Sequence, residues 1–260
     1  MTVIRQDDLI DSVADALQFI SYYHPVDFIQ AVNEAYEREE SQAARDAMAQ
    51  ILINSRMCAM GHRPICQDTG IVNVFVKVGM NVQWQGDMSV TDMINEGVRR
   101  AYKNPDNVLR ASVLADPDGA RKNTGDNTPA VINYEIVPGD TVEIDVAAKG
   151  GGSEAKSKFA MLNPSDSVVD WVLEQIPKMG AGWCPPGMLG IGIGGTAEKA
   201  GHRRAGIGRS DHRAGYQGQG FSRPCGQQSC GVDSQLCCHT PYPFHTGRLR
   251  TGLSDSTGSQ

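Results

Sequence analysis

Aliphatic residues nearly disappear from this chain after residue 200, and this break limits what can fold. Residues 1–200 contain 53 Ile, Leu, Val and Met residues, whereas the last 60 residues contain 5. A folded domain needs enough apolar side chains to bury. Residues 1–200 can therefore form a hydrophobic core. The last 60 residues cannot, and we expect 201–260 to be an irregular tail, disordered or non-native.

The charge balance changes at the same point. Residues 1–200 carry 17 Lys and Arg against 27 Asp and Glu, whereas the tail carries 7 Arg, 3 Asp, and neither Lys nor Glu. Such a change of composition leads us to interpret the tail as an out-of-frame reading of the gene. The acidic body argues against a nucleic-acid partner, and the basic tail is too irregular to be a binding arm.

Several classes of protein are not expected from this sequence. No apolar stretch approaches the roughly 18–20 residues that a membrane-spanning helix needs. The first residues lack the apolar region of a secretion signal, so a cytoplasmic location is expected. Cys58, Cys66 and Cys184 are scattered through the body, and the total of seven cysteines is odd. This does not suit a secreted disulfide framework, and reduced thiols are expected.

Periodicity predicts an α+β fold, with a helical N-terminal region followed by a mixed helix and sheet layer. Apolar residues at helical spacing predict helices over about 6–22, 25–40 and 42–60. Residues 71–78 are rich in β-branched side chains and predict a buried strand, and Ser89 with Asp92 predicts a capped helix over 90–103. Strands at 130–137 and 141–148 flank a Pro-Gly-Asp turn and predict a hairpin, and a last helix is expected up to about residue 178.

The connection between the third helix and the first strand is the first candidate for chemistry. Residues 65–70 read Ile-Cys-Gln-Asp-Thr-Gly. Cys66, Gln67 and Asp68 could present one soft ligand and polar groups to a single cavity. The alternative is a capped loop with a buried cysteine.

Three further segments carry candidates for substrate or cofactor binding. Arg110 could clamp a carboxylate, although a lone arginine is commonly solvated. Residues 148–153 contain three consecutive glycines that could approach an anion, with Lys156 or Lys158 adding charge, or could form a flexible turn. Residues 190–195 are glycine-rich but lack the spacing of a dinucleotide-binding loop.

Two distant cysteines could belong to one cluster site. Cys66 and Cys184 stand too far apart for a local zinc knuckle, but loops could bring them together. Iron–sulfur clusters are commonly held by four thiolates, and three would leave one iron open to substrate. We expect Cys58 to be a core residue, and His24 and His62 to have capping or surface roles at helix ends.

Four ordered motifs in residues 1–200 resemble the class I, iron–sulfur fumarate hydratases and the related L-tartrate dehydratases. The motifs are residues 65–70, residues 148–153, the Cys-Pro-Pro at 184–186 and the Ile-Gly-Gly-Thr at 193–196. The chain looks like the N-terminal, α-type part of such an enzyme, truncated and followed by an aberrant tail. Residues 1–200 are the expected hydro-lyase domain.

The resemblance implies reversible hydration of fumarate to L-malate, with a four-iron, four-sulfur cluster as Lewis acid. It implies Cys66 and Cys184 as two of three cluster ligands, and Asp68 as a catalytic residue that orients or activates a proton-transfer partner. It implies a small dicarboxylate substrate and a homodimer. The implied substrate contacts are Gln67, Asp68, Arg110, Gly152, Ala155, Lys156, Ser157, Lys158, Phe159, Ala160 and Met161.

The chain departs from the family pattern after residue 200. The third cluster cysteine, a catalytic histidine and a β-type domain are not identifiable, so this chain alone could be an inactive fragment. L-tartrate dehydratase activity is the alternative within the same enzyme class. A different alternative is a zinc module built from Cys225, Cys230, Cys237, Cys238 and His239, although their spacing fits no standard knuckle.

Overall fold

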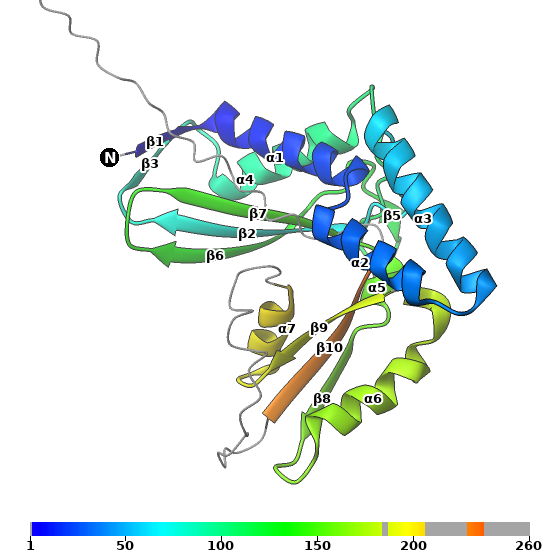
Figure 1. Ribbon diagram of the computed structural model, residues 1–260. Coiled ribbons are helices and arrows are strands. Elements are labelled where there is room, and N and C mark those ends of the chain that lie inside the picture. Colours follow the sequence, from blue (N-terminus) through cyan, green and yellow to red (C-terminus); the bar gives the residue numbers. More distant parts are fainter. Residues whose placement is uncertain (1, 184–186, 206–227, 237–260) are drawn as a thin grey trace, which may run out of the picture.

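The computed structural model describes residues 2–183, 187–205 and 228–236, and Figure 1 shows their arrangement. After a short first strand the chain forms three consecutive helices, and strands and helices are mixed in the two sheet-containing layers that follow, so the α+β expectation is confirmed. No helix in this described part of the chain combines the length and apolar character that crossing a membrane requires.

The first layer is a three-stranded sheet with β2 (Ile71–Gly79) in its centre. β6 (Val131–Val137) lies parallel to β2 on one side, and β7 (Val142–Lys149) lies antiparallel to it on the other. Val72, Val74 and Val76 of β2 are at most 1% exposed, as expected for alternate residues on the covered face of a sheet. The strand predicted at 71–78 is therefore present and buried.

The hairpin predicted for residues 130–148 is wrong, although both of its strands exist. β6 and β7 do not pair with each other, because β2 lies between them. Their connection passes over the end of β2, where the Gly79 and Met80 amides donate to the Thr141 and Val137 carbonyl groups at 2.9 Å. The Pro-Gly-Asp sequence correctly predicts that the chain reverses direction between β6 and β7, but it does not predict that β2 lies between these two strands.

Two helices cover one face of this sheet (Figure 1). α1 (Gln6–Tyr22) buries Leu9, Ile10, Val13 and Leu17, and α4 (Val90–Tyr102) packs alongside it. The side chain of Ser89 accepts a hydrogen bond from the Asp92 amide at 3.1 Å, which confirms the predicted N-cap. One hydrophobic core joins these helices to β2 and β7.

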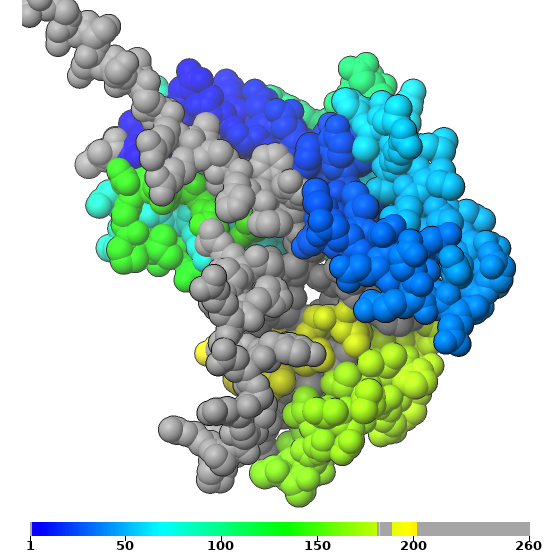
Figure 2. Space-filling model, in the orientation of Figure 1, coloured from blue at the N-terminus to red at the C-terminus, as the bar shows by residue number. Residues whose placement is uncertain are grey.

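The other two predicted N-terminal helices are also present, as α2 (Val26–Arg38) and α3 (Gln42–Gly61). They pack on each other, and Figure 2 shows them continuing the surface of α1 down one side of the molecule. Cys58 of α3 is 6% exposed, so its expected place in the core is confirmed. His24 is buried against the Phe28 ring rather than at the surface, whereas His62 is exposed at the C-terminal end of α3.

Short strands complete the first layer. β1 (Thr2–Arg5) pairs in parallel with β3 (Val82–Gln85) beyond the end of β2. β4 (Leu114–Ala115) and β5 (Lys122–Asn123) form a two-residue ladder in the segment that follows α4.

The second layer is smaller and contains β8 (Lys158–Leu162) and β9 (Gly187–Ile193) with β10 (Gln228–Leu236) between them. α6 (Val168–Met179) packs on β8 through Leu162, Val172 and Met179, which form a second core. Ser167 caps α6 by accepting from the Asp170 amide at 3.2 Å, and the helix predicted to reach about residue 178 is present and ends at Met179. α7 (Ala197–Ala205) packs beside β9 and β10.

Most of the tail expected at 201–260 lies outside the described residues. The described exceptions are the end of α7 and β10. The backbone of β10 pairs antiparallel with both β8 and β9, so it completes the second sheet.

Candidate functional site

The Cys66 loop connects α3 to β2, and hydrogen bonds fix its position. His62 ends α3 in the left-handed conformation, with φ of 47°. The Ile65 amide then donates to the Ser21 carbonyl group of α1 at 2.8 Å, and the Asn54 side chain donates to the Ile65 carbonyl group at 3.0 Å. These bonds hold the residue before Cys66 from both sides.

Cys66 is half-buried and its sulfur has polar neighbours. The Asp68 amide donates to the Cys66 Sγ at 3.4 Å, and the thiol lies 3.4 Å from the Gln67 side-chain oxygen. A backbone N–H directed at sulfur stabilises the thiolate form, which is the form that binds a metal. The loop therefore presents Cys66 as a chemically suitable soft ligand.

Gly70 brings this loop against the glycine-rich segment at the end of β7. This segment was expected to be a loop or flexible turn, but its second half forms the short helix α5 (Gly151–Glu154), and it is called the glycine-rich loop below. The register places Ile71 opposite Lys149, so the start of β2 and the end of β7 share one edge of the sheet. Gly70 has φ of +71°, and a Cβ atom there would lie 2.3 Å from the carbonyl group of Lys149. Only glycine permits both this conformation and this approach.

A carboxylate already lies against the glycine-rich loop, and it is that of Asp68. The Gly152 amide donates to the Asp68 Oδ2 at 3.5 Å, a long hydrogen bond. A Cβ atom at Gly150 would lie 2.9 Å from the same oxygen. The loop thus directs an N–H group at a carboxylate, which is the chemistry expected of an anion-binding loop.

Arg110 reaches the same edge of the sheet through its backbone. The Thr69 hydroxyl donates to the Arg110 carbonyl group, which ties the Arg110 segment to the Cys66 loop. The Arg110 side chain is exposed and extends from this anchored position. An exposed guanidinium held by its backbone at the site is available to a carboxylate ligand.

Two buried residues that sequence reasoning missed hold these loops together. Asn127 is completely buried; its side chain accepts from the Ser112 amide at 2.8 Å and donates to the Gly70 carbonyl group at 2.8 Å. The Tyr102 hydroxyl donates to the Thr69 carbonyl group at 2.9 Å, and burial raises the pKa of Tyr102 far above its usual value. The run of turn-forming residues around Asn127 signals a loop, but no local pattern reveals its distant partners.

The other predicted substrate contacts fall into two groups. A Cβ atom at Gly152 would lie 2.9 Å from the Gly182 carbonyl oxygen, and one at Gly182 would lie 2.9 Å from Lys156 Cε. Gly152 and Lys156 therefore adjoin the short helix η1 (Gly180–Trp183). Ala155 and Ser157 directly follow the glycine-rich loop, and their amides donate to the Gly151 and Glu154 carbonyl groups at 3.0 and 3.1 Å. Cys184 lies outside the described residues.

The second group belongs to strand β8 rather than to a loop. Its members are Lys158, Phe159, Ala160 and Met161. Ala160 packs toward the α6 core, whereas Phe159 and Met161 are about half exposed, at 49% and 56%. A strand alternates its side chains between two faces, so these four residues do not all face one site.

The described residues supply one thiol of the expected cluster. Within residues 2–183, 187–205 and 228–236, no three His, Cys, Asp or Glu side chains stand close enough to hold a metal ion. Cys66 fits as one ligand, and the described part of the chain does not complete a cluster site.

One edge of the sheet thus gathers a cysteine, a carboxylate, the glycine-rich loop and the backbone of an arginine. A family model described as fumarate hydratase (Fumerase) matches residues 10–205, which include all of these groups. The chain belongs to the fumarate hydratase family. This match confirms the resemblance seen in the four sequence motifs.

Curated relatives match nearly three quarters of this chain. A Methanocaldococcus jannaschii protein with the provisional name L(+)-tartrate dehydratase subunit alpha is 36% identical over 197 residues, covering 73% of this chain and 68% of the relative. The L(+)-tartrate dehydratase subunit alpha of Escherichia coli strain UTI89 is 31% identical over 196 residues, covering 74% of this chain and 64% of that protein. The matched part of the chain spans about two thirds of the length of these relatives.

Proposed function

We propose that this chain is the α-type part of a hydro-lyase that adds water to, or removes it from, a small dicarboxylic acid. The observation that carries the proposal is the meeting of Cys66, Asp68, Gly152 and the Arg110 backbone at one edge of the sheet. Family membership supports the reaction class, and the first substrate we propose is fumarate, with L-malate as product.

Different residues of the chain bind the two carboxylate groups of the proposed dicarboxylate substrate. The Arg110 guanidinium binds one substrate carboxylate, and the glycine-rich loop with Lys156 binds the other. Gln67 adds a side-chain amide at the mouth of the Cys66 loop. Positioning both carboxylates fixes the carbon atoms at which water adds.

Asp68 is the proposed residue for proton transfer. Its carboxylate lies beside the Gly152 amide, and its backbone amide donates to the Cys66 sulfur, so we propose that it orients or deprotonates a water molecule or a histidine from another part of the enzyme. A substrate carboxylate that takes over the Gly152 N–H would release Asp68 for this role.

We further propose Cys66 and Cys184 as ligands of a four-iron, four-sulfur cluster. When bound, the cluster supplies a Lewis acid for the oxygen atoms of the substrate. The third ligand is proposed to come from outside the chain as written, because the family motifs leave no candidate in residues 201–260. The chain alone is then expected to bind the cluster poorly.

L-tartrate is the second candidate substrate, and the names of the relatives favour it. The same loops suit both substrates, because each is a four-carbon dicarboxylate. The word subunit in those names favours a partner polypeptide that completes the site, and a homodimer of the α-type part remains our proposal for its own assembly.

The test compares two proteins after anaerobic iron–sulfur reconstitution. One is the full chain, and the other carries the C-terminal part of the Methanocaldococcus relative in place of residues 201–260. Each is assayed alone and together with a separately produced β-type domain of the family. The assays follow loss of fumarate absorbance and formation of oxaloacetate from L-tartrate. We expect turnover only in the completed protein, and absence of both activities there would refute the proposal.

Variants of the completed protein test the roles of individual residues. Arg110→Ala should lower kcat/KM by about 10- to 100-fold through the loss of a charge-assisted contact. Asp68→Asn should lower kcat more than it raises KM. Arg38→Ala, an exposed arginine at the end of α2, is the control and should leave both parameters unchanged.

A further inference from the structure

Helix α3 carries an apolar stripe on its solvent-facing side, at the surface of the molecule that Figure 2 shows. Ile53, Met57 and Met60 are between 59% and 76% exposed and recur at helical spacing, so they lie in one row. The buried residues of the same helix, Ser55 and Cys58, lie on the opposite side. A solvent-facing side of a helix is ordinarily polar, so an apolar row of this length is typical of a contact surface.

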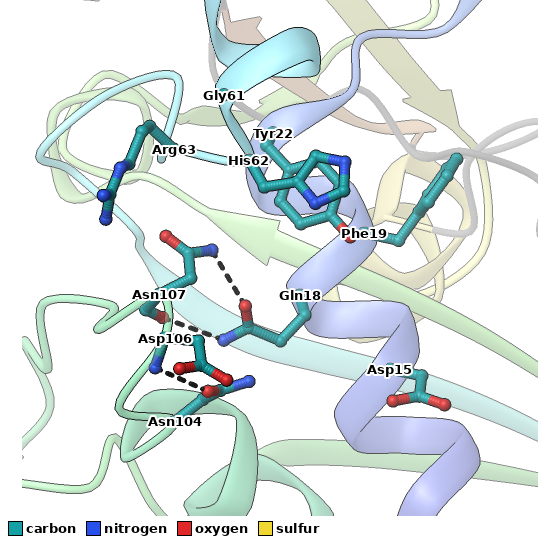
Figure 3. A pocket seen from close by; sticks show the side chains of 10 residues that line it. All are labelled: Asp15, Gln18, Phe19, Tyr22, Gly61, His62, Arg63, Asn104, Asp106 and Asn107. Carbon is teal, nitrogen blue, oxygen red and sulfur yellow. Dashed lines mark hydrogen bonds between the residues drawn. The ribbon is translucent and has the colours of Figure 1, made fainter.

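Contacts on the inner side of α3 fix the position of this stripe. At the end of the helix the His62 ring stacks on the Tyr22 ring of α1, with the ring centroids 4.6 Å apart (Figure 3). The Asn54 side chain donates to the Ile65 carbonyl group at 3.0 Å. The stripe is therefore a preformed surface, and a partner that binds it does not first have to order the helix.

The two halves of α3 carry side chains of different size on this face. The large side chains of the stripe all belong to the second half, whereas Ala49 and Ala43 belong to the first half. At 3.6 residues per turn, Ala49 lies about 40° and Ala43 about 80° around the helix from Ile53. Large side chains pack best into gaps left by small ones, so each half of α3 suits the other half of an antiparallel copy.

The charges on this face are divided between the two halves as well. Asp46 lies in the first half and Arg56 in the second, and both are exposed. Neither forms an ion pair with another residue that the structure describes. They lie about 15 Å apart along the helix axis. Two copies of α3 that cross antiparallel near Ile51 would place each Asp46 opposite the Arg56 of the other copy, so the charges are complementary twice.

We propose that α3 packs antiparallel on α3 of a second copy of this chain. Ile53 of one copy packs on Ala49 of the other. Met60 packs in the same way on Ala43, and Met57, whose flexible side chain adapts to an irregular surface, lies beside the ion pair. A two-fold contact of this kind is closed, so assembly ends at a dimer. The inference rests on the homodimer that we propose above and names its interface, and it is independent of the reaction.

Sedimentation velocity of the full chain tests the contact through mass alone. We expect a reversible dimer at protein concentrations up to about 100 μM, because the interface is small. Met57→Glu places a charge in the apolar contact and should raise the dissociation constant of the dimer at least about tenfold, with unchanged circular dichroism. Met80→Glu is the matched control, since Met80 is 71% exposed directly after β2. A monomeric full chain, or equal effects of the two variants, would overturn the proposal.

Charge reversals test the antiparallel orientation. Asp46→Arg and Arg56→Asp each place like charges opposite one another at two points of the contact, so each should raise the dissociation constant about tenfold. Both changes in one chain restore opposite charges and should return the constant to within about threefold of its original value. Absence of this recovery would contradict the antiparallel contact. None of these measurements uses enzymatic activity, so this proposal and the hydro-lyase function can fail separately.

Discussion

At the scale of single residues, the candidate site depends on buried polar groups more than on the exposed ones. Asn127 is the clearest case, since its one side chain bonds to the segment after Arg110 and to Gly70. Its φ of 62° is also a conformation that asparagine tolerates better than most residues. The loops that carry Cys66 and Arg110 therefore meet through a residue that is completely buried.

Asn127→Ala should lower the free energy of unfolding by about 3 kcal/mol, because it leaves buried amide and carbonyl groups without partners. Urea unfolding followed by circular dichroism measures the loss. Asn123→Ala is the matched control, since Asn123 is exposed although it bonds to the Ala111 carbonyl group at 2.7 Å. A smaller loss for Asn127→Ala than for Asn123→Ala would contradict this account.

Cys58 should resist alkylation in the folded chain. It is 6% exposed, and burial raises the pKa of its thiol, so little thiolate is available to react near neutral pH. Iodoacetamide at pH 7.5, with peptide mapping by mass spectrometry, should modify Cys58 at least about tenfold more slowly than in urea. The half-buried Cys66 should show a smaller protection factor, and equal factors would count against the described burial.

At the scale of elements, the helices agree with their local patterns and the strand order does not. The three N-terminal helices lie within two residues of their predicted bounds, because apolar spacing and capping residues act locally. The order β6-β2-β7 depends instead on which strands compete for the centre of the sheet. β2 lies in the centre, where its alternate buried valines pack in one core with side chains of α1 and α4.

The close packing of α1 on α4 depends on Gly97. A Cβ atom there would lie 2.7 Å from both the Ile10 carbonyl oxygen and the Val13 Cβ. Gly97→Ala should therefore destabilise the fold by about 1–3 kcal/mol, despite the better helix propensity of alanine. Thermal unfolding checks this, with Gly61→Ala as the control, because only Arg63 Cγ at 3.7 Å is near that position.

The contact between α4 and the Asp126 segment should weaken in acid. Burial opposes ionisation of both Glu96 and Asp126. Hydrogen bonds from Arg99 and Arg100 nevertheless lower the pKa of Glu96. Hydrogen bonds from Thr128 and Arg99 lower the pKa of Asp126. A lowered carboxyl pKa stabilises the folded state at neutral pH, and this contribution is lost as the pH falls below about 4.

Arg99→Met tests this contribution. It should cost about 0.5–1 kcal/mol at pH 7, because the arginine is partly exposed, and less at pH 3, where protonation of the two carboxylates has begun. Unfolding titrations at the two pH values measure the difference. A cost that is independent of pH would show that the charges do not contribute.

At the scale of the whole molecule, the two layers have separate cores. The larger core joins α1, α4, β2 and β7, whereas the smaller one joins β8 and α6. β10 provides backbone partners for both β8 and β9, so the second sheet depends on a strand from the last 60 residues.

Deletion of residues 206–260 should therefore affect one layer selectively. Hydrogen exchange should become faster in β8 and β9, which lose their middle strand, and stay slow in β2. Deuterium uptake measured by peptide mass spectrometry distinguishes the two layers. Equal acceleration in β2, or unchanged exchange in β8, would contradict the described role of β10.

Short stretches of sequence were enough to predict the helices, the buried strand, the place of the core and the family, because periodicity, capping and ordered motifs are properties of short segments. The three-dimensional structure was needed to see that β2 separates β6 from β7 and that Asn127 joins the Cys66 and Arg110 loops. Each of these depends on contacts between residues far apart in the chain. All segments of the chain compete for the same space and the same hydrogen-bond partners. The contacts that result cannot be predicted from the pattern of any one short segment.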